Sequence, residues 1–303
     1  MTETLAVDAV PSVLQAVLIV LAVSVLWAAI GSYQVLHQVR YCPPETPAEY
    51  GLSWETLKLT TSDNVPIAGW FVRHPQGQGT LLLLHGFGTS KADLLDVAQS
   101  FYQMGKFHIL MIDFRGHGAS GGKTYSFGLH EVLDVRAALD FVAAAPALKT
   151  LPVGCYGISM GGAIAMLSAA RFPEIRAVVS DSAYADWGKA IARAVWLSYH
   201  IPRVPLGQLV VWGTQVRLKC RVRDLSPVNV IGKIAPRNVL IVHGMNDRTV
   251  PHKAAEVLYR AAGEPKRLWL VPGAEHVGSF YMDKTEYLRQ VLEFFDDAFR
   301  RAT

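Results

Sequence analysis

VGCYGISMGG, residues 153–162, contains the strongest structural signal in the chain. Four residues with a strand pattern lead into the turn Gly157-Ile158-Ser159-Met160-Gly161, and small residues after it predict a helix. A serine on such a strand–turn–helix junction projects its hydroxyl beyond the sheet, and glycines on either side let neighbouring chain approach without Cβ clashes. The free N–H groups at the start of the helix favour negative charge beside the serine. We therefore expect Ser159 to be a nucleophile.

Short apolar runs alternate with helical patterns on both sides of this turn. Continuous apolar strands are buried on both faces, which predicts a doubly wound α/β fold with a parallel sheet between helices. Two further strand patterns at 54–61 and 65–72, separated by a turn, predict a hairpin at the start. The apolar runs are 80–84, 108–112, 153–156, 177–180, 239–242 and 267–271, and the helix patterns are 94–104, 128–145, 160–171, 253–262 and 285–300.

A serine nucleophile needs a base, and the base needs an acid that orients it. His276 follows the strand at 267–271, and Asp247 follows the strand at 239–242. Carboxyl ends of parallel strands share one edge of a sheet, so both side chains are expected beside Ser159. The order Ser, Asp, His is also found in known hydrolases.

Other polar residues at this edge have weaker claims to these roles. Asp181 ends the strand at 177–180 and is the alternative acid. His85 and His117 lie in glycine-rich loops, where we expect them to satisfy backbone groups. For the oxyanion, the backbone N–H of Met160 and that of Phe87, in the first loop after a strand, are the expected donors.

The N-terminal region predicts a membrane anchor over residues 1–40. Residues 13–30 are apolar except for Gln15 and Ser24, and eighteen helical residues span about 27 Å, close to the hydrocarbon thickness of a bilayer. A cleaved signal peptide and a buried core helix are the alternatives; the lack of a preceding Lys or Arg and of an amphipathic stripe disfavours them. Arg40 follows the span, so the positive-inside rule favours a cytoplasmic catalytic domain by one charge.

Composition excludes several classes of protein. The 303 residues are 51% hydrophobic and 18% charged, which excludes a disordered chain, and three cysteines are too few for a disulfide scaffold. The formal charge is +4, without a nucleic-acid-binding motif, so nucleic acid is not an expected partner. The cysteines show no metal-ligand spacing, and we expect neither a metal nor a cofactor.

Residues 184–230 interrupt the alternation of strands and helices. This segment is rich in tryptophan and leucine, and we expect a helical cap over the carboxyl edge of the sheet. Within it, residues 216–223 alternate apolar and basic side chains. The pattern suits a half-buried segment with a solvated face, or contact with anionic lipid headgroups or an acidic substrate group.

From about Trp54 to Phe299 the chain resembles the α/β-hydrolase superfamily, especially bacterial serine hydrolases related to prolyl-oligopeptidase catalytic domains and membrane-anchored eukaryotic α/β-hydrolase-domain proteins. The resemblance implies an eight-stranded, mostly parallel sheet, a triad at Ser159, Asp247 and His276, and an oxyanion hole at Phe87 and Met160. The matching motifs are LLLHGFG (82–88), MIDFRGHGAS (111–120), YGISMGG (156–162), SPVNVIGKI (226–234), VLIVHGMNDRTVP (239–251) and GAEH (273–276).

These observations predict a single-pass membrane protein with a linker at 41–52 and an α/β-hydrolase domain at 53–303. The expected activity is hydrolysis of carboxylic esters with acyl or other apolar groups, through an acyl-enzyme on Ser159. The expected partners are a small-molecule ester and the lipid bilayer. A peptidase or amidase of prolyl-oligopeptidase type is the alternative enzyme, and a catalytically silent, membrane-tethered binding module is the alternative outside enzymes.

Overall fold

The computed structural model describes residues 4–37, 39–200 and 202–301. The chain forms two compact units, which are described separately. The sheet unit consists of Gln38–Trp187 and Val222–Thr303, and the cap unit consists of the chain up to His37 together with Gly188–Arg221.

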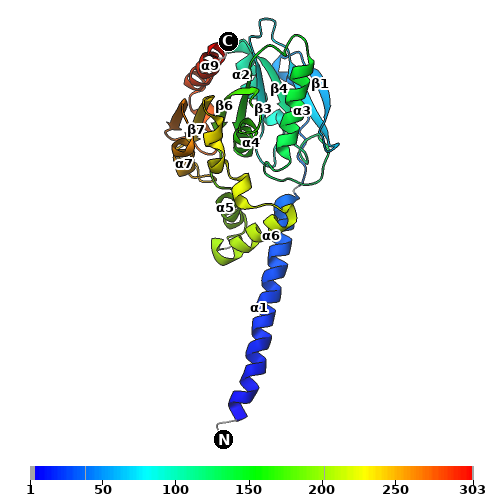
Figure 1. Ribbon diagram of the computed structural model, residues 1–303, viewed down its shortest axis with the longest axis vertical. Coiled ribbons are helices and arrows are strands. Elements are labelled where there is room, and N and C mark those ends of the chain that lie inside the picture. The colour runs from blue at the N-terminus through cyan, green and yellow to red at the C-terminus, as the bar shows by residue number, and fades with distance from the viewer. Residues whose placement is uncertain (1–3, 38, 201, 302–303) are drawn as a thin grey trace. The chain divides into compact units, whose positions relative to one another are not determined.

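The sheet unit is built on one eight-stranded sheet with the order β1-β2-β4-β3-β5-β6-β7-β8 (Figure 1). Strands β1 and β2 form an antiparallel hairpin, β2 pairs antiparallel with β4, and the remaining pairs are parallel. The mostly parallel sheet expected from the sequence is therefore confirmed. The strands are β1 (Glu55–Thr60), β2 (Pro66–Val72), β3 (Thr80–Leu84), β4 (His108–Ile112), β5 (Val153–Ile158), β6 (Ile175–Asp181), β7 (Asn238–Gly244) and β8 (Lys266–Val271).

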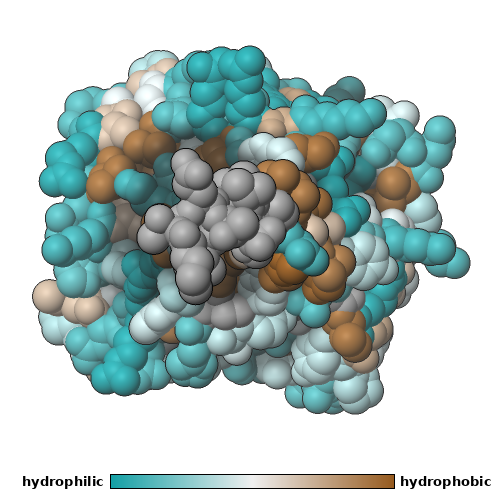
Figure 2. Space-filling model, turned by 90° about the horizontal axis from the view of Figure 1, so that it is seen from below, coloured by the Kyte–Doolittle hydropathy of each residue, from teal (hydrophilic) through white to brown (hydrophobic). Residues whose placement is uncertain are grey.

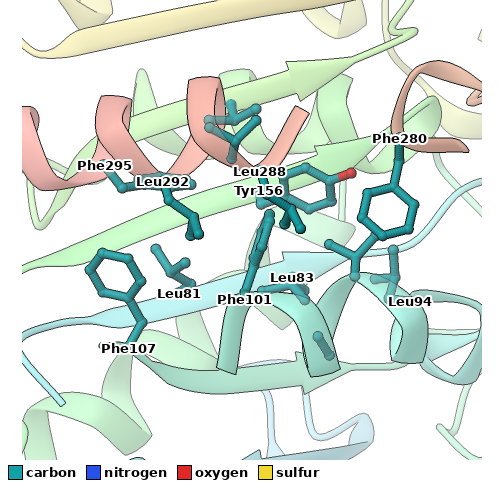
Figure 3. Close-up of a cluster of buried hydrophobic side chains, with 14 of the residues drawn as sticks. Leu81, Leu83, Leu94, Phe101, Phe107, Tyr156, Phe280, Leu288, Leu292 and Phe295 are labelled. Carbon is teal, nitrogen blue, oxygen red and sulfur yellow. The ribbon is translucent and has the colours of Figure 1, made fainter. Parts of the chain in front are cut away.

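Alternate strand residues point to opposite faces of the sheet, and the central strands are buried at every position. Helices therefore cover both faces. Leu81 and Leu83 of β3 pack with Phe101 of α2 and Phe295 of α9 (Figure 3). The opposite face contacts α3 and α4. The helices of this unit are α2 (Leu95–Met104), α3 (Glu131–Ala144), α4 (Met160–Ala169), α7 (Lys253–Ala261), α8 (Ser279–Met282) and α9 (Lys284–Arg300), with 3₁₀ turns at Pro47–Tyr50, Lys91–Leu94, Val222–Leu225, Pro227–Asn229 and Ile231–Ile234.

Residues 41–52, expected as a linker, are attached to the sheet unit. Leu52 is buried in the hydrophobic cluster between the sheet and α2, and the Gln99 side chain donates a hydrogen bond of 2.8 Å to the Tyr50 carbonyl. Just before them, the Arg40 guanidinium donates to the carbonyl oxygens of Gly118, Ser120 and Gly122. Side-chain contacts thus hold this segment against folded structure.

The cap unit contains α1 (Thr4–Leu36), most of α5 (Trp187–Tyr199), a π-helical turn at Arg203–Gly207 and α6 (Gln208–Leu218). The segment Val13–Leu36 is long and apolar enough to cross a membrane, and the same test is passed by signal sequences. Its side chains from Val13 to Leu26 are mostly exposed, whereas Ala28 and Ser32 are buried. The reason is that α6 packs against α1 at this level.

Candidate active site

Ser159 occupies a sterically demanding turn between β5 and α4. Its φ is +50°, in the left-handed region that L-residues rarely adopt, and its backbone N–H donates to the Asp181 carbonyl at 2.8 Å. A Cβ atom at Gly161 would lie less than 3.0 Å from the carbonyl oxygens of Leu84 and His85. A Cβ at Gly157 would collide in the same way with the backbone of Gly161. Both glycines are therefore required for the close approach that exposes Ser159.

The structure brings Ser159, His276 and Asp247 together. The Nε2 atom of His276 lies 3.0 Å from Ser159 Oγ, and its Nδ1 atom lies 2.7 Å from Asp247 Oδ2. Because an ionised carboxylate can only accept, Nδ1 carries the proton, and Nε2 of the neutral ring is free to accept the proton of the serine hydroxyl. The ring thus bridges the Ser159 hydroxyl and the Asp247 carboxylate.

Asp247 is kept ionised by its surroundings. Burial opposes its ionisation, but hydrogen bonds from His243 and His276 outweigh burial and lower its pKa to about 2. The backbone N–H groups of Thr249 and Val250 each donate to Oδ1 at 2.8 Å. Sequence reasoning missed His243, although its position four residues before Asp247, at the end of β7, is a signal that could have identified it.

Asp181, the alternative acid, occupies a different position. Its carboxylate accepts hydrogen bonds of 2.8 Å from the hydroxyls of Ser182 and Tyr287. Ser182 Oγ in turn accepts from the backbone N–H of Val277 at 3.1 Å, next to His276. Burial raises the pKa of Asp181. Asp181 thus supports the loop that holds His276, whereas Asp247 contacts the imidazole itself; sequence reasoning missed Ser182 and Tyr287 because neither belongs to a motif.

The loop after β3 lies against Ser159. A Cβ at Gly86 would be 3.6 Å from Ser159 Cβ, which places the backbone of this loop beside the serine. Phe87 follows Gly86, and its ring stacks on Phe127. Met160 is the first residue of α4, where backbone N–H groups have no partner within the helix.

Two histidines stabilise this loop, as the sequence predicts. His85 Nε2 accepts from the Phe114 N–H at 3.0 Å, and its Nδ1 donates to the Gly86 carbonyl at 2.7 Å. His117 Nε2 accepts from the Gly88 N–H at 3.3 Å. Burial lowers the pKa of both rings, that of His85 to about 3, so they act as neutral hydrogen-bonding groups.

A Lys91–Asp113 ion pair supports the same region. Lys91 Nζ lies 2.6 Å from Asp113 Oδ2, and both side chains are nearly inaccessible to solvent. Asp113 also accepts from the backbone N–H groups of Lys91 and Ala119 at 2.8 Å. These hydrogen bonds satisfy the acceptor oxygens of the buried Asp113 carboxylate. The ion pair can therefore join the loop after β3 to the loop after β4 without leaving an uncompensated buried charge. Within the described ranges, no group of three or more His, Cys, Asp or Glu side chains could hold a metal ion.

Known proteins share this architecture. A family model described as serine aminopeptidase, S33, matches residues 75–224. The α/β hydrolase domain-containing protein WAV2 of Arabidopsis thaliana is 26% identical over 262 residues, covering 84% of this chain and 82% of the relative. The Pyrococcus furiosus esterase Pf2001 superimposes with a TM-score of 0.72 at 24% identity, covering 87% of this chain and 98% of the esterase.

One further solved structure covers nearly all of the chain. A membrane phospholipase A, described as a bacterial virulence factor, superimposes with a TM-score of 0.60 at 19% identity, covering 98% of this chain and 99% of its own. Structural similarity at 19% identity shows a shared fold and no more than that. Together with the order of the eight-stranded sheet, the matches show that the chain has the α/β-hydrolase fold.

Proposed function

We propose that the protein is a serine hydrolase that cleaves carboxylic esters with acyl or other apolar groups. The observation that carries the proposal is the continuous hydrogen-bonded series from Ser159 Oγ through His276 to Asp247. This series matches the geometry of a nucleophile, a general base and an orienting acid.

The reaction proceeds in two halves. His276 Nε2 takes the proton from Ser159 as Oγ forms a bond to the ester carbonyl carbon, and the N–H groups of Met160 and Phe87 stabilise the resulting oxyanion. When the tetrahedral intermediate collapses, the C–O bond to the alcohol breaks and the imidazolium gives its proton to the leaving oxygen. Water, deprotonated by His276, then attacks the acyl-enzyme and releases the carboxylic acid, which restores Ser159.

Two observations bear on the choice between esters and amides. Pf2001 is named an esterase and a further solved structure is named a phospholipase A, and both names favour an oxygen ester. The family model is described as an aminopeptidase, which favours a second candidate function, amide hydrolysis at the same serine. Both activities would use the same three side chains, so substrate assays must separate them.

We also propose that α1 is a retained membrane anchor. Arg217 of α6 donates to Ser32 Oγ at 2.9 Å and to the Ala29 carbonyl at 3.0 Å, so polar contacts tie α1 to α6. Removal of α1 as a signal peptide would leave Val210 and Gly213 of α6, which are buried beside it, without their partner. The match to the membrane phospholipase A, extending over 98% of this chain, is consistent with a retained helix.

The activity is tested with p-nitrophenyl esters and matched p-nitroanilide amides. Ser159→Ala should lower kcat for the ester by about 10⁴-fold or more, because the nucleophile is lost. Ser62→Ala, at an exposed turn, is the control and should retain wild-type turnover. Equal rates for wild type and Ser159→Ala would refute the mechanism, whereas faster turnover of the amides than of the esters would favour the peptidase alternative.

A further inference from the structure

We propose that the exposed face of the cap unit, formed by α5, the turn at 203–207 and α6, lies in the headgroup region of an anionic lipid bilayer. We call this surface the cap face. The inference rests on the proposed role of α1 as an anchor. It adds a second membrane contact to the chain, one made by side chains far from α1 in the sequence.

The packing of α6 on α1 limits where the cap face can lie. Gly31 of α1 sits against Val210, and Gly213 of α6 sits against the Ala28 carbonyl and Ser32. At 1.5 Å per residue, Ala28 and Ser32 lie about 12 and 6 Å from Leu36, the last residue of the apolar segment. If α1 spans a bilayer, α6 therefore meets it close to the boundary between hydrocarbon and headgroups.

The side chains of the cap face suit that boundary. Trp196 and Tyr199 of α5, Val204 of the turn, and Trp212 and Val216 of α6 are 40–70% exposed. Trp and Tyr are enriched where an apolar ring body meets lipid and its polar edge meets headgroups. In the view from below, brown apolar side chains form separate patches among hydrophilic side chains (Figure 2). Soluble surfaces seldom concentrate so many large apolar groups.

The charge of the segment selects the type of lipid. Residues 188–221 contain no Asp or Glu, and their cations are Lys189, Arg193, Arg203, Arg217, Lys219 and Arg221. The Arg203 guanidinium lies 5.2 Å from the centre of the Trp196 ring, so a cation and an interfacial aromatic side chain are presented together. Basic residues beside an apolar surface are attracted to anionic headgroups. An acidic protein or a second copy of the chain would not account for the continuity of this surface with α1.

The test measures the depth of single nitroxide labels in the full-length protein. In a Cys42→Ser/Cys220→Ser background, one label is placed at Val204→Cys in the cap face, one at Val20→Cys in α1 and one at Ser62→Cys in the sheet unit, all exposed positions. The protein is reconstituted into vesicles of phosphatidylcholine with an equal amount of phosphatidylglycerol. Collision of each label with oxygen, which enters lipid, is compared with collision with a water-soluble nickel chelate.

The three labels separate the outcomes. We expect the oxygen-to-nickel ratio at position 204 to exceed that at position 62 several-fold and to be lower than that at position 20. A ratio at 204 equal to that at 62, with 20 in lipid, overturns the cap-face proposal alone. A ratio at position 20 as low as that at position 62 places α1 in water and overturns the anchor proposal. Neither result depends on ester turnover. Low access of both reagents to position 204 indicates cover by protein, such as a second copy, and also overturns the proposal.

Charge-neutralising variants test the preference for anionic lipid. Arg203→Gln/Lys219→Gln should lower the ratio at position 204 in phosphatidylglycerol vesicles toward its value in pure phosphatidylcholine. The matched control Lys58→Gln/Lys123→Gln removes two exposed lysines of the sheet unit and should leave the ratio unchanged. An equal effect of both pairs, or no difference between the two lipid compositions in the parent protein, would contradict a role for the cap-face cations.

Discussion

The turn around Ser159 and the cap segment 188–221 are stabilised in opposite ways. At the turn, glycines admit backbone approach that no Cβ would tolerate, and buried polar groups find partners within the sheet unit. In the cap segment, α6 is held by α1, and large apolar side chains remain exposed. Changing a single side-chain atom at the turn should therefore lower activity or stability strongly. Substitutions in the cap face should have little effect unless a bilayer is present.

After loss of the serine itself, the largest effect is expected from Asp247→Asn. An amide at this position no longer stabilises the Nδ1–H tautomer of His276, and kcat for esters should fall by about 10⁴-fold. Asp181→Asn is the matched control, since it removes a neighbouring carboxylate that contacts Ser182 and Tyr287, and its loss should be much smaller. Equal losses, measured as kcat on a p-nitrophenyl ester, would show that the two carboxylates cannot be assigned different roles.

Gly161→Ala should be the next most damaging change. Its Cβ would meet the Leu84 and His85 carbonyls, and since backbone cannot easily move in the sheet, the free energy of unfolding should fall by about 3 kcal/mol or more. Gly51→Ala is the control, because that Cβ would meet nothing within 4 Å and only the positive φ of 68° opposes it, at a cost of about 1 kcal/mol. Denaturant unfolding of the two variants should differ clearly; similar values would refute the steric account.

His85, in the loop after β3, should make the stability of the fold sensitive to acid. His85 has a pKa of about 3 in the folded protein against 6.5 for the free side chain, so unfolding takes up a proton once the pH falls below 6.5. Its contribution is complete above pH 6.5 and should decrease by about 2 kcal/mol between pH 6.5 and 5. His85→Gln, which cannot titrate, should lack this part of the pH dependence of the unfolding free energy. An unchanged slope would show that His85 does not carry it.

The smallest effect is expected in the cap face. Trp212→Ser removes a ring that is 55% exposed, so the unfolding free energy in detergent should change by less than about 0.5 kcal/mol. Turnover of a soluble ester should be unchanged as well. A large loss of stability in detergent would mean that the ring is part of a protein core, and the contrast between the two regions would fail.

Local patterns were sufficient to predict the sheet because each apolar run is short, continuous and bounded by turn residues. The expected strand at 80–84 and the observed β3 coincide, and the helix expected at 94–104 begins one residue later as α2. The turn at Ser159 was predictable for a similar reason, since its glycines and its place between strand and helix are adjacent in the chain. Those features depend on sterics over a few residues, which the sequence displays directly.

The sequence by itself determined the sheet, its carboxyl edge and the three side chains expected there, because strand direction alone brings the ends of β5, β7 and β8 to one edge. The tertiary structure decided what lies behind them. Tyr287 reaches Asp181 from 106 residues away, and Arg217 reaches Ser32 from 185 residues away. Contacts at such separations leave no periodic trace in the chain, because each depends on how whole helices pack. For that reason α1 and α6 are separate segments in the sequence and form one unit in the fold.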